Sequence, residues 1–249
     1  MLHKVEGIII RTNDYGETNK ILTLYTRENG KVALMARGAK RPKSRFASSA
    51  QLFIYGIFIY HRTSGLGTLN QSDMIDSFKE IRSDLKITAH GAYILELLDK
   101  LTEDNVRNPY LFELVFQSLS FLNDGVDPEI ITRIFETKML EVAGVAPLLD
   151  RCTLCGNPES NFGFSMKHSG LLCNSCKDED LYHLELHSSV LKLLRLFQYI
   201  DLKRLGNINV KQETKQQLKK LLELYYEEYV GVYLKSKRFL DQVDRLYES

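Results

Sequence analysis

The chain has 249 residues, of which 44% are hydrophobic and 26% are charged, and its formal net charge is +1. This balance is typical of a globular chain that forms one large domain or two modest ones, and it excludes disordered, collagenous and fibrous classes. The longest apolar stretch, 52–60, is interrupted by Gly56. It is much shorter than the roughly 20 residues of a membrane-spanning helix, and residues 1–11 lack the features of a signal peptide. We therefore expect a cytoplasmic protein without a membrane partner.

Charge is distributed unevenly along the chain. The first 72 residues carry a net charge of +7, because 29–72 contains seven basic residues and no acidic residue. The rest of the chain carries a net charge of −6. Such asymmetry points to an anionic partner for the N-terminal part. We expect the acidic remainder to be the part that docks other proteins.

Short segments rich in β-branched and aromatic residues follow one another through the first 75 residues, and turns containing glycine separate them. They predict five strands, at 4–12, 19–26, 31–37, 50–61 and 67–75. Asn29-Gly30 lies between two of these segments and predicts a type I′ hairpin turn, because both residues tolerate a positive φ. Five short strands at this spacing indicate a small barrel, with 38–49 as an exposed loop.

The periodicity becomes helical after Ser77. Asn108-Pro109 and Asp127-Pro128 each combine a capping side chain with a proline suited to the first position of a helix. Leucine-rich stripes with helical spacing occupy 94–101, 111–122, 190–200 and 218–229. We expect helices over about 80–145 and two more after residue 187, the first of them capped by Ser188 or Ser189. The pattern predicts an α+β chain, with a barrel domain at 1–79 and a helical domain at 80–249.

Four cysteines form two Cys-x-x-Cys pairs, Cys152 with Cys155 and Cys173 with Cys176, with 17 residues between the pairs. Two such pairs can bring four thiolates into the tetrahedron that a structural zinc ion requires. In a reducing compartment this grouping favours a metal over disulfides. A site closed by four thiolates has no position for water, so we expect one structural Zn²⁺ per chain, in an insert at about 150–178. Free or redox-active cysteines and an iron–sulfur cluster are the alternatives.

Two histidines follow the last cysteine with the spacing of a zinc-finger pair. His183 and His187 are separated by three residues. Because four cysteines already complete a tetrahedron, we expect these histidines to be surface or capping residues rather than metal ligands.

The densest group of uncompensated cations lies between the third and fourth predicted strands. We call residues 37–45 the basic loop; its cations are Arg37, Lys40, Arg41, Lys43 and Arg45. Pro42 restrains the loop backbone, so several cations are held near one another at modest entropic cost. Phosphate is the natural counterpart. We expect Arg11, Lys31 and Arg62 to join the basic loop in a surface that binds nucleic acid.

Barrels that bind oligonucleotides hold single strands across a basic surface with aromatic side chains as stacking platforms. The candidate rings here are Phe46, Phe53, Tyr55, Phe58 and Tyr60. Alternation along the fourth predicted strand would place Phe53 and Tyr55 on one face. Each of these rings can equally belong to the barrel core, and we favour the core for each one.

No catalytic constellation emerges from the sequence. Nucleotide-binding glycine loops, the nucleophile elbow and the zinc-protease motif are all missing. Asp73, Asp76 and Glu80 offer carboxylates that a metal-dependent nuclease would need, but the same spacing suits the solvent side of a strand end and a helix start. We expect that the protein is not an enzyme.

Several motifs resemble those of the RecO family of bacterial DNA repair and recombination proteins. The similarity extends over nearly the whole chain, in order; it includes Glu6 to Ile10, Asp14 to Glu17, Leu24 to Thr26 with Gly30 and Lys31, Ala36 to Phe46, Leu95 to Leu97, and the four cysteines. The resemblance implies an N-terminal OB-fold, a helical C-terminal domain and, in many members, a zinc-binding insert. It also implies a recombination mediator that binds single- and double-stranded DNA and anneals complementary strands.

The resemblance further implies partners. A member of this family would pair with RecR and would bind the C-terminal tail of the single-stranded DNA-binding protein SSB, so that RecA can load; it would work in the cytoplasm at the nucleoid. Two other functions remain open from the residues alone. One is a zinc-ribbon adaptor whose basic loop binds RNA or an acidic protein, and the other is a metal-dependent nuclease.

Overall fold

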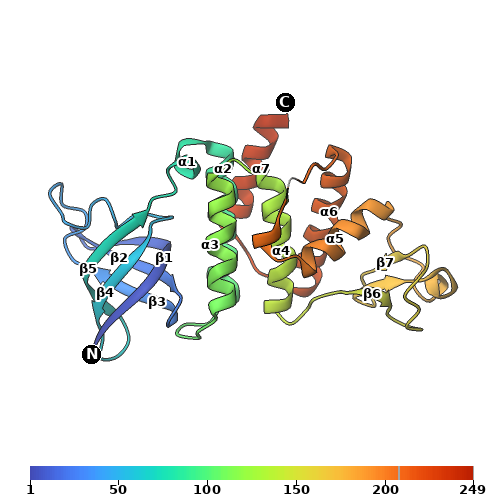
Figure 1. Ribbon diagram of the computed structural model, residues 1–249, viewed down its shortest axis with the longest axis horizontal. Coiled ribbons are helices and arrows are strands. Elements are labelled where there is room, and N and C mark those ends of the chain that lie inside the picture. Colours follow the sequence, from blue (N-terminus) through green and yellow to red (C-terminus); the bar gives the residue numbers. More distant parts are fainter. Residues whose placement is uncertain (207, 249) are drawn as a thin grey trace. The chain divides into compact units, whose positions relative to one another are not determined.

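The computed structural model describes residues 1–206 and 208–248. Contacts within the chain define two compact units, which are Met1–Pro128 with Leu234–Ser249, and Glu129–Tyr233. Figure 1 shows the order of the elements along the chain. The first helices after the barrel and the last helix belong to the same compact unit as the barrel. In the described part of the chain no helix is long and apolar enough to span a membrane.

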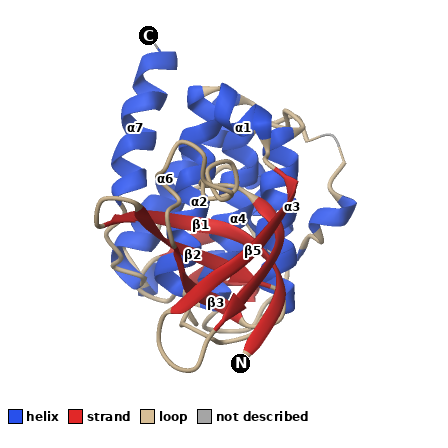
Figure 2. Cartoon of the chain, turned by 90° about the vertical axis from the view of Figure 1, so that its left-hand side faces the viewer, coloured by secondary structure: helices blue, strands red, loops and turns tan. Residues whose placement is uncertain are grey.

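The N-terminal strands form a closed barrel. They are β1 (Leu2–Tyr15), β2 (Asn19–Thr26), β3 (Gly30–Ala36), β4 (Tyr55–His61) and β5 (Gly67–Asp76). Their order around the barrel is β1-β2-β3-β5-β4, with β3 and β5 parallel and the other neighbouring pairs antiparallel. Figure 2 shows these strands crossing around the barrel. A closed five-stranded barrel of this kind confirms the predicted OB-fold.

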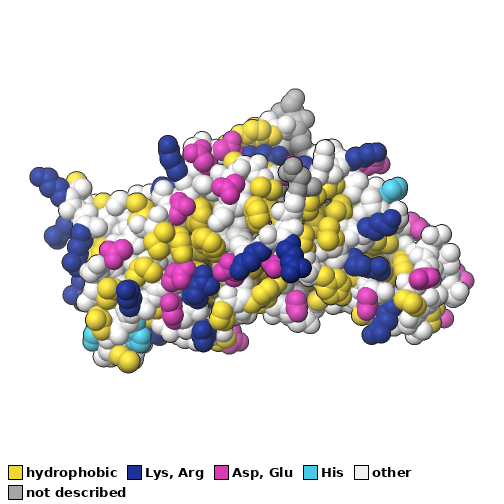
Figure 3. Space-filling model, viewed as in Figure 1, with side chains coloured by type: hydrophobic (Ala, Val, Ile, Leu, Met, Phe, Trp, Pro, Cys, Tyr) yellow, Lys and Arg dark blue, Asp and Glu magenta, His cyan; other side chains and the backbone are white. Residues whose placement is uncertain are grey.

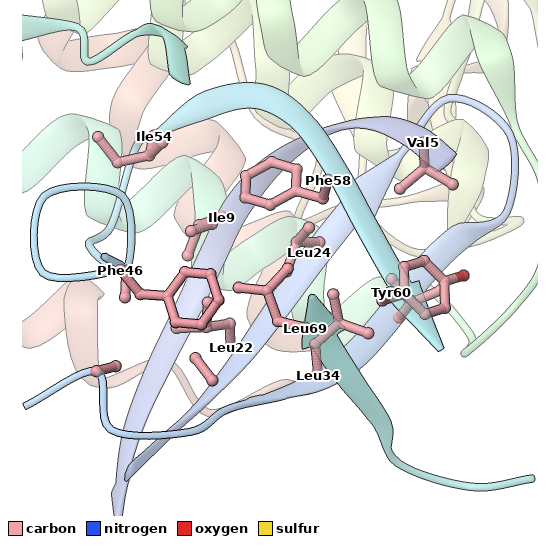
Figure 4. Close-up of a cluster of buried hydrophobic side chains, with 14 residues drawn as sticks. Val5, Ile9, Leu22, Leu24, Leu34, Phe46, Ile54, Phe58, Tyr60 and Leu69 are labelled. Atoms are coloured by element: carbon pink, nitrogen blue, oxygen red, sulfur yellow. The ribbon is translucent and has the colours of Figure 1, made fainter. Parts of the chain in front are cut away.

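The barrel closes around one apolar cluster. Side chains from all five strands contribute to it, and Figure 4 labels Val5, Ile9, Leu22, Leu24, Leu34, Phe46, Ile54, Phe58, Tyr60 and Leu69. Phe46, Phe58 and Tyr60 are therefore core residues, as we expected. Of the other two candidate rings, Phe53 is buried and Tyr55 is half-buried. Neither belongs to this cluster.

The fourth strand begins later than predicted. β4 starts at Tyr55, whereas the sequence pattern extends the strand back to residue 50. Phe53 has a φ of 70°, in the left-handed region, so the chain cannot remain extended there. Its ring packs against Gly91 of α2 (Leu85–Leu101), where even a Cβ atom would come within 3.0 Å of the ring. Phe58 and Tyr60 then point into the core, whereas Tyr55 is half-buried on the outer face.

The predicted hairpin between β2 and β3 is present, but its turn is not type I′. Thr26 pairs with Gly30, which leaves the loop 27–29 between them. Gly30 has a φ of 65°, whereas Asn29 does not have a positive φ. The Thr26 hydroxyl accepts a hydrogen bond from the Asn29 backbone N–H at 3.1 Å and donates one to the Gly30 carbonyl at 2.8 Å. Side-chain hydrogen bonds therefore close this turn, in place of a second residue with positive φ.

Four helices complete the first unit. They are α1 (Lys79–Ser83), α2, α3 (Pro109–Asn123) and α7 (Lys235–Glu248). The Asn108 side chain caps α3 as predicted, because it accepts a hydrogen bond from the backbone N–H of Leu111 at 3.0 Å. α7 packs on α2, and the Glu96 carboxylate accepts the backbone N–H of Ser236 at 2.7 Å in the first turn of α7. A carboxylate at a helix N-terminus is stabilising there.

An ion cluster joins the barrel to α3. The Arg27 guanidinium lies 2.9 Å from Glu6 and 3.2 Å from Glu113 of α3, and it stacks over the Phe112 ring at 4.4 Å. The Tyr55 hydroxyl donates to Glu6 at 2.6 Å. Burial, together with the neighbouring Glu6 carboxylate, raises the pKa of Tyr55 to about 12. Tyr55 is therefore part of this cluster.

The second unit combines helices with a small sheet. Its helices are α4 (Pro128–Val142), α5 (Ser188–Tyr199) and α6 (Gln212–Tyr229), with short 3₁₀ helices η1 (Asn174–Glu179) and η2 (Leu202–Arg204). Its strands β6 (Leu148–Cys152), β7 (Gly163–Ser165) and β8 (Gly170–Leu172) form a sheet in the order β6-β8-β7. The cap of α5 is His187, whose side chain accepts from the Ser189 backbone N–H, and neither Ser188 nor Ser189 has that role.

Candidate functional site

The basic loop is held on the barrel by apolar side chains. Ala39, Phe46 and Ala50 come from the connection between β3 and β4, and all three belong to the barrel core. Successive turns run through the loop, because the backbone N–H of Arg41 donates to the Gly38 carbonyl at 3.0 Å and that of Ser44 donates to the Arg41 carbonyl at 2.9 Å. The predicted exposed loop is therefore a folded connection that presents its charged side chains to solvent.

Cations of the basic loop cover one end of the barrel. Arg37, Arg41 and Lys43 are exposed, and none of them makes an ion pair with a described residue. In Figure 3 Lys and Arg side chains gather at the left of the view, over the β3–β4 connection. Arg45 lies over the Phe46 ring at 4.7 Å, which orients its guanidinium. The loop therefore offers several positive groups that have no negative partner within the described chain.

Lys40 ties the basic loop to the β1–β2 hairpin. Its ammonium lies 2.8 Å from a carboxylate oxygen of Asp14, and its backbone N–H donates to the Thr18 carbonyl at 2.9 Å. The hydrogen bond from Lys40 holds the pKa of Asp14 below its usual value. The Gly38 backbone N–H donates to the Asn19 side chain at 2.8 Å. The loop and the hairpin tip therefore form one surface.

The structure places Lys31 away from solvent. Its side chain is 11% exposed, and its ammonium donates to the backbone carbonyls of Asp99 and Thr102, each at 2.7 Å. The Asp99 carboxylate lies 3.3 Å from the same ammonium. A cation held in this way joins β3 to the end of α2 and is not available to a phosphate. We therefore leave Lys31 out of the candidate DNA surface.

The two remaining predicted cations lie on other parts of the barrel surface. Arg11 is half exposed and lies 3.1 Å from Asp99. Arg62 donates a hydrogen bond to the Asn105 side chain. Both side chains remain partly exposed to a ligand, but each already interacts with another side chain of the protein. Among the described residues of the barrel, the basic loop therefore holds the largest group of exposed cations without an ion-pair partner.

The four cysteines come together in the second unit. All four Sγ atoms lie within 4.8 Å of one another. Cys155 and Cys173 have their Sγ atoms 3.5 Å apart, too far for a disulfide, whose S–S bond is about 2.05 Å. Zn–S bonds of about 2.3 Å in a tetrahedron place sulfurs slightly less than 4 Å apart. The cluster therefore fits a structural metal ion with four thiolate ligands.

Backbone N–H groups are directed at the cysteine cluster. The Cys173 backbone N–H donates to the Cys152 sulfur at 3.4 Å. Burial of Cys152 opposes ionisation, but hydrogen bonds from surrounding backbone N–H groups lower its pKa to about 6. Hydrogen bonding to Cys173, with burial, raises the pKa of Cys176 to about 12. Four sulfurs this close cannot all ionise alone, and a bound cation removes that conflict.

The other candidate ligands lie apart from this cluster. His183 lies 2.8 Å from the Asp180 carbonyl and 3.0 Å from Glu185, and His187 caps α5. Both histidines are surface or capping residues, as predicted.

Among the described residues, the cysteine cluster is the one group of His, Cys, Asp or Glu side chains that could hold a metal ion. Asp73 accepts from the Gln71 side chain and Asp76 from the Phe78 backbone N–H, so these carboxylates serve local structure.

Matches to known proteins cover both units of the chain. Residues 1–78 match the family model described as Recombination protein O N terminal, and residues 82–238 match Recombination protein O C terminal. The DNA repair protein RecO of Halalkalibacterium halodurans is 52% identical over 246 residues, which cover 99% of this chain and 97% of that protein. DNA repair protein RecO of Bacillus subtilis is 53% identical over 99% of this chain and 96% of its own length. The barrel, the cysteine cluster and these matches show that the chain belongs to the RecO family of DNA repair proteins.

Proposed function

We propose that the protein is a mediator of homologous recombination that binds single- and double-stranded DNA, anneals complementary strands and makes no covalent change in them. The observation that carries this proposal is the folded basic loop on an OB-fold barrel, with Arg37, Arg41 and Lys43 exposed. Cations on such a barrel neutralise phosphates and release condensed counterions, whatever the base sequence. Neutralising two strands at once lowers their mutual repulsion and favours their pairing.

The proposed DNA surface is centred on the basic loop. Phosphates lie along its cations, Arg37, Lys40, Arg41, Lys43 and Arg45. Arg11 and Arg62 extend the surface along the barrel, each while keeping a protein partner. Because phosphate contacts position a strand without reading its bases, affinity depends on salt and not on sequence.

The cysteine cluster is proposed to hold one structural zinc ion. Cys152, Cys155, Cys173 and Cys176 supply four thiolates, the donor set of closed zinc sites. A bound zinc ion would hold β6 and β8 together at the base of the insert. It would leave no open coordination position, so the ion would stabilise the second unit and take no part in a reaction.

The proposed partners follow from membership of the family. RecR and the C-terminal tail of SSB are expected to bind, and RecA is expected to load on the strand as a result. The acidic part of the chain after residue 72 is the expected docking region for proteins. A mediator acting on chromosomal DNA works in the cytoplasm at the nucleoid.

Annealing without nucleotide is the expected result for the purified protein. Complementary labelled strands should pair severalfold faster with the protein than without it, in the absence of ATP. Magnesium should not cause nicks, because the carboxylates Asp73 and Asp76 are not gathered into a metal site. Fluorescence energy transfer between the two labelled strands measures annealing, and denaturing electrophoresis measures nicking.

Two results would contradict the proposal. One is annealing that requires ATP. The other is nicking that needs magnesium and disappears in Asp73→Asn, which would indicate a nuclease. Equilibrium binding to single-stranded DNA, duplex DNA and RNA of the same length tests the remaining alternative, because an RNA or protein adaptor would bind neither form of DNA.

A further inference from the structure

One aromatic ring of the barrel is left in solvent. The Tyr15 side chain is 53% exposed, at the end of β1. Among the described tyrosines and phenylalanines of the five strands, the others are buried or half-buried. Tyr15 pairs with Asn19 across the hairpin, and Gly16 follows it with a φ of 59°. A positive φ at Gly16 turns the chain sharply, so the ring stands at the hairpin tip and does not fold back on the core.

The hairpin tip that carries Tyr15 is fixed to the basic loop. Three contacts join them: the Lys40 ammonium with Asp14, the Lys40 backbone N–H with the Thr18 carbonyl, and the Gly38 backbone N–H with the Asn19 side chain. These contacts involve residues on both sides of Tyr15. The hairpin tip that carries Tyr15 and the basic loop therefore form one preformed surface.

The chemistry of the tip favours an uncharged, flat ligand. Asp14 is already paired with Lys40, and Glu17 adds another carboxylate at the turn. A phosphate group would be repelled by Glu17, whereas a nucleobase carries no charge and offers a face to the ring. Base–aromatic stacking tolerates any base, because every base has a π-face. The β1–β2 loop is also one of the positions at which OB-folds contact oligonucleotides.

We propose that Tyr15 stacks on a base of single-stranded DNA whose phosphates lie along the basic loop. This inference rests on the proposed function and assigns a second kind of contact to the same surface. In an intact duplex both faces of each base are already stacked on neighbouring pairs. The ring therefore adds affinity for single strands, while the cations serve single strands and duplex alike.

The chain contains no tryptophan, so Tyr15→Trp introduces a single tryptophan, whose fluorescence can be excited separately from that of the tyrosines. We expect oligo(dT) to quench the fluorescence of this variant, because the indole stacks on a base. A duplex should leave the fluorescence nearly unchanged. The matched control is Tyr182→Trp, since Tyr182 is 90% exposed but lies in the second unit close to Asp178 and Glu179 in sequence. Oligo(dT) should not quench that control.

Affinity measurements complete the test. Tyr15→Ala should weaken binding to oligo(dT) about 10-fold or more, the contribution typical of one base–aromatic stack. Tyr15→Phe should keep nearly full affinity. The slope of log affinity against log salt should not change in either variant, because no phosphate contact is lost. Circular dichroism checks folding, which the exposed position of Tyr15 leaves intact.

The outcomes separate this inference from the proposed function. If wild-type protein does not bind oligo(dT), the proposed DNA surface is wrong. If wild-type protein binds but Tyr15→Trp is not quenched and Tyr15→Ala binds equally well, the stacking role of Tyr15 is overturned and the basic loop stands. An equal loss of affinity for single strands and duplex in Tyr15→Ala would also overturn it.

Discussion

Cys152→Ser is expected to abolish metal binding and to destabilise the second unit strongly. Cys152 is 1% exposed in the cysteine cluster, and its sulfur accepts the Cys173 backbone N–H. Zinc contributes about 10–16 kcal/mol to the folding of isolated zinc-finger peptides. Losing even a third of that would lower the free energy of unfolding by about 3–5 kcal/mol and the melting temperature by about 10–20 °C. Metal analysis and calorimetry measure both effects.

The control for this variant is Ser175→Ala. Ser175 lies between Cys173 and Cys176 and is exposed, so its replacement should keep one zinc ion per chain and the wild-type melting temperature. DNA affinity should change little in Cys152→Ser as long as the barrel stays folded. The zinc assignment would be wrong if wild-type protein, purified without added zinc, contained free thiols and no metal.

Lys31→Met is expected to destabilise the first unit without affecting the DNA surface. The variant keeps the apolar stem of the side chain but removes the ammonium that Asp99 and the Thr102 carbonyl contact. Breaking a buried ion pair costs about 3–5 kcal/mol, and we expect about 2–3 kcal/mol here because Arg11 still faces Asp99. Urea denaturation followed by circular dichroism measures the loss.

Lys43→Met provides the matched comparison. Lys43 is exposed in the basic loop, so its replacement should change stability by less than about 0.5 kcal/mol. It should, however, reduce the salt dependence of DNA binding, which Lys31→Met should leave unchanged. A Lys31→Met protein of wild-type stability but weaker salt dependence would show that Lys31 reaches a phosphate after all.

Local patterns predicted the barrel and the cysteine cluster. Alternating apolar residues and glycine turns identify β1, β2, β3 and β5. Each of these strands pairs with a strand that is near in sequence, or ends at a turn. The two Cys-x-x-Cys pairs identify the cluster for the same reason, since each pair is short and fixed by its own turn. Capping by Asn108 likewise depends on the next three residues alone.

Long-range contacts account for what the sequence could not show. Phe53 leaves the extended conformation because its ring packs on Gly91, and this delays the start of β4. The ammonium of Lys31 is paired with Asp99, which lies 68 residues away in the sequence. A cation that has no acidic neighbour in the sequence is therefore paired in the folded protein. Tyr15 lies within the segment from Asp14 to Glu17 that resembles the family, but the sequence does not show that its ring is exposed, because exposure depends on how the hairpin meets the basic loop.

The most direct test of the DNA surface is the salt dependence of binding to single-stranded DNA. Wild-type protein is compared with a variant in which Arg37, Arg41 and Lys43 are replaced by alanine. Each phosphate neutralised on a single strand contributes about −0.7 to the slope of log affinity against log salt, so we expect the slope of the variant to be about two units shallower for every sequence tested. Equal slopes and equal affinities in the two proteins would contradict a DNA surface at the basic loop.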